Sequence, residues 1–120
     1  MTANNVLLID DDRTILVLYA NFLSKEGITA YQADNAKMAV TTVMNVPIRL
    51  IITDINMPDM NGIVLAKQLK DRYTSVPIIA MSALPFKDNK EALVEAGISG
   101  FLRKPVKREL FIETVKKYLI

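Results

Sequence analysis

Five polar residues stand at the ends of four apolar runs in this 120-residue chain, and they are Asp10 and Asp11 after the first run, then Asp54, Ser82 and Lys104. Short apolar runs are typical of strands buried on both faces of a parallel sheet. The carboxyl ends of such strands meet at one edge of an open α/β sheet, where ligands bind. We therefore expect three acids, one hydroxyl and one ammonium group to converge on a single site.

The chemistry that this set favours is phosphoryl transfer to a carboxylate. Clustered carboxylates repel one another and raise one another's pKa values, and a hard divalent cation removes that repulsion. Oxygen ligands without histidine or cysteine favour magnesium or calcium over zinc. A lysine can meet one phosphate oxygen as a point charge, and a serine hydroxyl can hydrogen-bond another. These groups together make an aspartyl-phosphate site, with Asp54 as the expected nucleophile.

Five strands alternating with five helices are expected to position these residues. The apolar runs predict strands at residues 6–9, 28–32, 49–53, 76–81 and 100–103. Helical spacing of apolar residues predicts a helix after each strand, with Asp12 as a cap of the first helix. In the fourth helix we expect Ala92, Leu93 and Ala96 to point inward and Gly97 to end the helix. The alternation predicts an α/β fold, a doubly wound parallel sheet with helices on both faces.

The composition excludes several classes of site. The chain contains no cysteine and no histidine, which rules out disulfides, Cys or His zinc sites, Ser-His nucleophiles and an internal phosphohistidine. A net charge of +2 is too small to predict nucleic-acid binding. No apolar run reaches the roughly 18 residues of a transmembrane helix, and the first residues lack the pattern of a signal peptide. We expect one cytoplasmic domain over residues 1–120, without direct contact to nucleic acid or membrane.

Four segments together resemble the signature of the response-regulator receiver domain of two-component phosphorelay systems. They are IDDD at 9–12, TDINMPDMNG at 53–62, MSA at 81–83 and SGFLRKP at 99–105. They occur in the family's order and spacing, and the resemblance covers essentially the whole chain. It implies a flavodoxin-like (βα)5 fold with strand order 2-1-3-4-5. The second segment is rich in turn residues, with Pro58, Asp59, Asn61 and Gly62 close together, and Asp59 and Asn61 are interpreted as turn formers.

The resemblance implies a magnesium ion beside the phosphoacceptor. Asp54 would accept the phosphoryl group. Asp11, Asp54 and the backbone carbonyl of Asn56 would bind Mg²⁺ directly, and Asp10 would act through water. The chain would catalyse its own phosphorylation and slow dephosphorylation, and it is not expected to be an enzyme otherwise.

The resemblance also implies which groups hold the phosphoryl group. Lys104 and Ser82 would contact it through their side chains, with help from the backbone N–H groups of Asn56 and Ala83. The small side chain of Ala83 would leave it room. The Lys104-Pro105 peptide bond would be cis, a form available chiefly to bonds that precede proline.

A switch and a set of partners follow from the same resemblance. Phosphorylation would draw Ser82 toward the phosphoryl group, Phe101 would turn inward, and the face of the fourth helix, fifth strand and fifth helix would change shape. The donor would be a sensor histidine kinase or a histidine phosphotransfer protein, and a downstream protein would bind the changed face. Phe101 stands where the family often has tyrosine, so the switch lacks a hydroxyl. Ser99 and Gly100 lack the acid that dimerising regulators often place there, which favours a monomer or a weak phosphorylation-dependent dimer.

Two other functions fit parts of the sequence. Residues 10–15 match the motif of haloacid-dehalogenase-like phosphatases, in which Asp10 would be the nucleophile, but the paired acids that such enzymes carry late in the chain are missing after Lys104. A pseudo-receiver, which binds partners without taking phosphate, is the other alternative, and the full set of acids, hydroxyl and lysine disfavours it. The chain can be a stand-alone regulator or the receiver segment of a longer protein such as a hybrid kinase.

Overall fold

The computed structural model describes residues 4–57 and 61–119, so residues 58–60 of the segment 53–62 lie outside the described part. Five strands form one sheet, and they are β1 (Asn5–Ile9), β2 (Thr29–Ala33), β3 (Leu50–Asp54), β4 (Ile78–Ser82) and β5 (Gly100–Arg103). Each neighbouring pair is parallel, and the order is β2-β1-β3-β4-β5. The predicted fold class and strand order are therefore confirmed.

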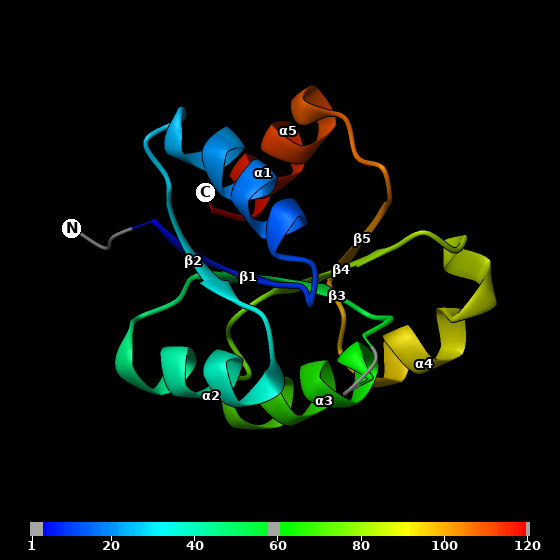
Figure 1. Cartoon of the computed structure of the whole chain (residues 1–120). Helices are drawn as coiled ribbons and strands as arrows, with labels where there is room; N and C mark the ends of the chain where they lie inside the picture. Colours follow the sequence, from blue (N-terminus) through cyan, green and yellow to red (C-terminus); the bar gives the residue numbers. More distant parts are fainter. Residues whose placement is uncertain (1–3, 58–60, 120) are drawn as a thin grey trace.

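Helices cover both faces of the sheet. They are α1 (Arg13–Ser24), α2 (Ala36–Asn45), α3 (Gly62–Arg72), α4 (Lys90–Glu95) and α5 (Arg108–Leu119), with a short 3₁₀ helix, η1 (Phe86–Asp88), before α4. Figure 1 shows α1 and α5 above the sheet and α2, α3 and α4 below it. Among the described residues, no helix combines the length and the apolar character that crossing a membrane requires.

The double covering explains why the three central strands β1, β3 and β4 are buried throughout and largely apolar. Successive side chains of a strand point to opposite faces. Val6 and Leu8 of β1 accordingly pack in the core under α1 and α5, where the rings of Tyr19 and Phe111 stack with centroids 4.6 Å apart. Leu7 belongs to the second core, under α2 and α3. Both faces of the central strands are buried, so neither face carries the polar residues of a half-exposed strand.

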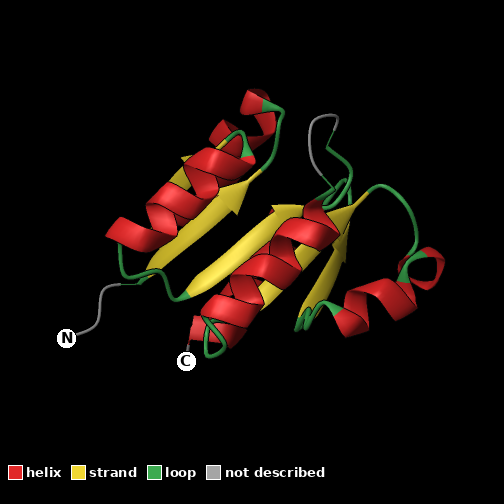
Figure 2. Cartoon of the chain, turned by 90° about the horizontal axis from the view of Figure 1, so that it is seen from below, coloured by secondary structure: helices red, strands yellow, loops and turns green. Residues whose placement is uncertain are grey.

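The register of the sheet brings the strand ends to one edge. Ile9 pairs with Thr53, so Asp10 and Asp54 emerge side by side from β1 and β3. Asp54 in turn pairs with Met81, which places the end of β4 next to it. In Figure 2 the strand arrows point the same way, so the loops after them gather at the arrowhead edge. This edge is where the sequence analysis placed the site.

The predicted start of α1 and the predicted end of α4 are confirmed, but one expected inward position in α4 is wrong. Asp12 caps α1 as predicted, because its carboxylate accepts hydrogen bonds from the N–H groups of Thr14 and Ile15. Gly97, with φ of +80°, follows the end of α4 as predicted. The expected inward position of Ala92 is wrong, since this residue is exposed. The helix is only six residues long and is preceded by η1, so a single continuous helical face does not exist there.

Candidate functional site

Three carboxylates meet at the carboxyl edge of the sheet. One oxygen from each of Asp10, Asp11 and Asp54 lies within 4.8 Å of the others. Asp10 is 1% exposed and Asp54 6% exposed, whereas Asp11 is exposed to solvent. Two buried acids with a third at the rim form an all-oxygen set that suits a hard divalent cation such as magnesium. The donor set therefore fits the metal that the sequence analysis expects.

Lys104 is the cation that this structure places among the acids. Its Nζ lies 2.6 Å from Asp10 Oδ2 and 3.6 Å from Asp54 Oδ1. The end of β5 positions it, because the Lys104 backbone N–H donates to the carbonyl of Ser82 at 2.8 Å. The Lys104-Pro105 peptide bond is cis. The lysine thus bridges two carboxylates and lies closer to Asp10.

Burial and charge shift the ionisation of the site. Burial raises the pKa of Asp54 above its ordinary value, and the negative charge of Asp10 adds to the rise, while Lys104 offsets only part of it. For Lys104, burial alone would lower the pKa, but the hydrogen bond with Asp10 and the charges of Asp10 and Asp54 together raise it. The lysine therefore stays protonated. The ionised form of Asp54 is disfavoured by burial and by the charge of Asp10, and an additional cation would favour it.

Ser82 is fully buried at the end of β4, and its hydroxyl is held by neighbours other than the acids. Ser82 Oγ accepts hydrogen bonds from Asn56 Nδ2 and from the Leu84 backbone N–H, both at 3.0 Å. The Asn56 backbone N–H donates to Asp54 Oδ1 at 3.4 Å. Ala83 follows Ser82 and is exposed. Asn56 consequently touches both Asp54 and Ser82, a link that the sequence pattern does not reveal.

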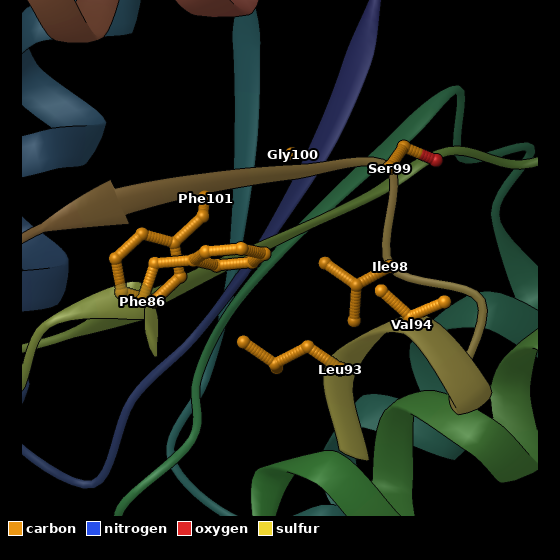
Figure 3. Close-up of a pocket in the computed structure, with 7 residues that line it drawn as sticks. All are labelled: Phe86, Leu93, Val94, Ile98, Ser99, Gly100 and Phe101. Atoms are coloured by element: carbon orange, nitrogen blue, oxygen red, sulfur yellow. The ribbon is translucent and has the colours of Figure 1, made fainter. Parts of the chain in front are cut away.

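Phe101 lies on β5, which is separated by β4 from β3 and its Asp54. Its ring is half-buried and meets the ring of Phe86 edge-on, with centroids 5.3 Å apart. It packs against the small cluster of Ile55, Ala80 and Leu93. The two rings also border a pocket of about 430 Å³ between α4 and β5, in which Figure 3 shows them side by side. Because Ile55 follows Asp54 directly, this packing connects the acid cluster with the outer face.

Gly62 shapes the site in a way that the sequence analysis missed. It opens α3, and a Cβ atom on it would lie 2.1 Å from the Asp54 carbonyl oxygen and 2.7 Å from Ile55 Cα. The N–H of Gly62 donates to the carbonyl of Ile55 at 3.2 Å. Only a residue without a side chain lets α3 begin this close to the end of β3. A glycine at the start of a helical pattern, after a turn that follows an acid, was the available signal.

The comparisons with known proteins agree with this geometry. Residues 6–116 match the family model described as the response regulator receiver domain. The polar-differentiation response regulator DivK of Brucella anthropi is 27% identical over 96% of this chain and 95% of its own length. The two-component response regulator ARR13 of Arabidopsis thaliana is 36% identical over 85% of this chain, but the match spans only 18% of that protein. The solved structure of chemotaxis protein CheY4 of Vibrio cholerae has the same fold, with a TM-score of 0.93, 24% identity, and coverage of 98% of this chain and 99% of its own.

Substituting Gly62→Ala should destabilise the chain, although alanine normally favours a helix over glycine. The new methyl group would collide with backbone atoms of β3, which cannot rotate away, so we expect a loss of about 1–3 kcal/mol of unfolding free energy, typical of overpacking. Urea denaturation measures this, with Lys67→Ala on the exposed side of α3 as the control. Equal stability of Gly62→Ala and the parent would contradict the close approach.

Replacing Asp54→Asn should stabilise the chain at pH 7 in the absence of divalent ions. The pKa of Asp54 is higher in the folded chain than in the unfolded chain, where it is about 4. The protonated carboxyl therefore favours the folded state at pH values below about 4. This contribution to the free energy of unfolding is lost as the pH rises through the pKa of the folded state. Thermal melts of parent and variant should therefore differ at pH 7 and converge as pH falls toward 4. Magnesium should narrow this difference in melting temperature at pH 7, because the cation offsets the clustered negative charge. A variant less stable than the parent at pH 7 would contradict this account.

Proposed function

The chain belongs to the response regulator receiver domain family of two-component systems, and on that premise we propose that Asp54 accepts a phosphoryl group in a magnesium-dependent reaction. The observation that carries the proposal is the cluster of Asp10, Asp11 and Asp54 with Lys104 among them. The chain has no histidine, so a phosphohistidine donor belongs to a sensor kinase or phosphotransfer protein, or to another segment of a longer protein.

Asp54 is a better nucleophile than Asp10 because its oxygens are less engaged. Asp10 accepts a hydrogen bond from Lys104 at 2.6 Å through Oδ2 and another from the Asp12 N–H at 2.9 Å through Oδ1. Among residues 4–57 and 61–119, the contacts of Asp54 Oδ1 are the longer ones to the Asn56 N–H at 3.4 Å and to Lys104 Nζ at 3.6 Å. An Asp54 oxygen attacks the phosphorus, the bond from phosphorus to the donor's imidazole nitrogen breaks, and that nitrogen keeps the electron pair and takes a proton. This distinction disfavours a phosphatase with Asp10 as nucleophile.

The cation would be held by Asp11, Asp54 and the backbone carbonyl of Asn56, with Asp10 acting through water. When bound, magnesium neutralises the clustered carboxylates and stabilises the charge of the transferring phosphoryl oxygens. Asp10 and Asp54 are buried and therefore oriented, while the exposed Asp11 leaves the edge open to a donor. This arrangement positions the reactants, which is most of what phosphoryl transfer requires of a protein.

Lys104, Ser82 and the backbone N–H groups of Asn56 and Ala83 would hold the phosphoryl group once it is on Asp54. Lys104 has only to shift from Asp10 toward Asp54, which its Nζ already approaches. Slow hydrolysis then ends the signal, and we propose no other catalytic activity. A pseudo-receiver that never takes phosphate would not need a lysine that contacts both Asp10 and Asp54, so this contact disfavours that alternative.

The output would be a change of the face formed by α4, β5 and α5, in the cytoplasm. Phe101 lies on β5, in the middle element of that face, and it borders one pocket with the exposed side chains of Phe86 and Val94. On α5, Leu110 is a further exposed apolar side chain. An apolar surface of this kind suits a protein partner that binds one state of the face better than the other. The chain would act as a monomer or weak phosphorylation-dependent dimer, either alone or as the receiver segment of a longer protein.

Incubation with a small acyl phosphate and magnesium should add one phosphoryl group to the parent chain, as measured by intact mass. The adduct should be absent without magnesium and absent in Asp54→Asn. Asp12→Asn is the matched control, because Asp12 is an adjacent acid that caps α1, and it should be phosphorylated like the parent. No adduct on the parent would favour the pseudo-receiver, and an adduct retained by Asp54→Asn would refute the assignment of the nucleophile.

A further inference from the structure

The hydroxyl of Ser82 is committed to two donors in this structure. A serine oxygen has two acceptor sites and one proton to donate. Both acceptor sites are filled, by Asn56 Nδ2 and by the Leu84 N–H, each at 3.0 Å. Ser82 is 0% exposed although its partner Asn56 is exposed, and a buried hydroxyl that loses a partner is destabilised. These two bonds therefore fix where the hydroxyl sits.

The fixed position is not one in which Ser82 serves the acid cluster. Within residues 4–57 and 61–119, Ser82 Oγ makes no hydrogen bond with Asp54 or Lys104. Phe101 is at the same time half-buried and packed on the ring of Phe86. In the switch expected for this family, Ser82 would move toward Asp54 and Phe101 would turn inward, so the positions seen here correspond to the resting arrangement of that switch.

We propose that Asn56 is a positioning residue that latches Ser82 in this resting arrangement through its side-chain amide. A phosphoryl oxygen on Asp54 would accept the remaining Ser82 proton, and to donate it the hydroxyl would have to leave the position in which the amide holds it. The hydrogen bond from the Leu84 N–H comes from the backbone, so a substitution at position 84 does not remove it. The hydrogen bond from Asn56 comes from the side chain, and a substitution at position 56 does remove it. The inference rests on the proposed function, and it adds that the residue two positions after the phosphoacceptor sets the balance between the two states.

The latch makes a quantitative prediction for a phosphoryl analogue. Beryllium fluoride with saturating magnesium should bind the parent, and Asn56→Leu, which keeps the bulk but lacks the donor, should bind it about 2- to 10-fold more tightly, the range that one net hydrogen bond supports. Asn56→Ala should act in the same direction. In a Ser82→Ala background the same Asn56 substitutions should change the affinity less than 2-fold, because the latch has no hydroxyl to hold. Calorimetry measures all of these affinities, and a separate magnesium titration shows whether the metal affinity has changed.

A second measurement does not depend on the analogue. Without ligand, the amide resonances of Gly100 and Phe101 in Asn56→Leu should shift along the line that joins the free and analogue-bound parent, because the population of the second state rises. Shifts off that line, equal effects in the Ser82 and Ser82→Ala backgrounds, or weaker analogue binding by the Asn56 variants would each overturn the latch. A parent that binds no beryllium fluoride in the presence of magnesium would instead overturn the proposed function, and the latch with it.

Discussion

The charge balance among Asp10, Asp54 and Lys104 is the interaction on which the rest of the site depends. Two carboxylates are buried together, and one ammonium group lies 2.6 Å from the first and 3.6 Å from the second. One cation cannot neutralise both, and the exposed Asp11 adds a third negative charge within reach. The folded chain therefore holds excess negative charge at this edge, and this excess is what favours a divalent cation there.

The fold supplies the constraint that keeps these charges together. Parallel pairing sets the ends of β1, β3 and β4 side by side, and two buried cores prevent the strands from sliding. Gly62 allows α3 to begin against the backbone of Asp54. Ile55, which follows Asp54, and Phe101 share one apolar cluster. Side-chain packing therefore connects the acid cluster with the surface around Phe101. The site and the surface proposed for output are thus built from neighbouring positions of the same strands.

The sequence predicted the central strands and their polar ends well, because the buried strands β1, β3 and β4 are largely apolar runs that each lead into a polar residue. It also predicted Asp12 as a cap, a local interaction between neighbours in the chain. It failed for Ala92, since helical spacing alone does not reveal that η1 shortens α4. The bond between Asn56 and Ser82 joins segments that only folding brings together, so no local pattern indicates it. The close approach of Gly62 to the end of β3 had only an indirect signal, a glycine at the start of a helical pattern.

The central claim is that the phosphoryl group goes to Asp54, and chemical mapping tests it most directly. Sodium borohydride reduces an aspartyl phosphate to homoserine, and tandem mass spectrometry of the digested chain then reports the position of the change. After reaction with an acyl phosphate and magnesium, the account predicts homoserine at position 54 alone. Homoserine at position 10 or 11, or a phosphate that survives reduction on a serine or threonine, would contradict it.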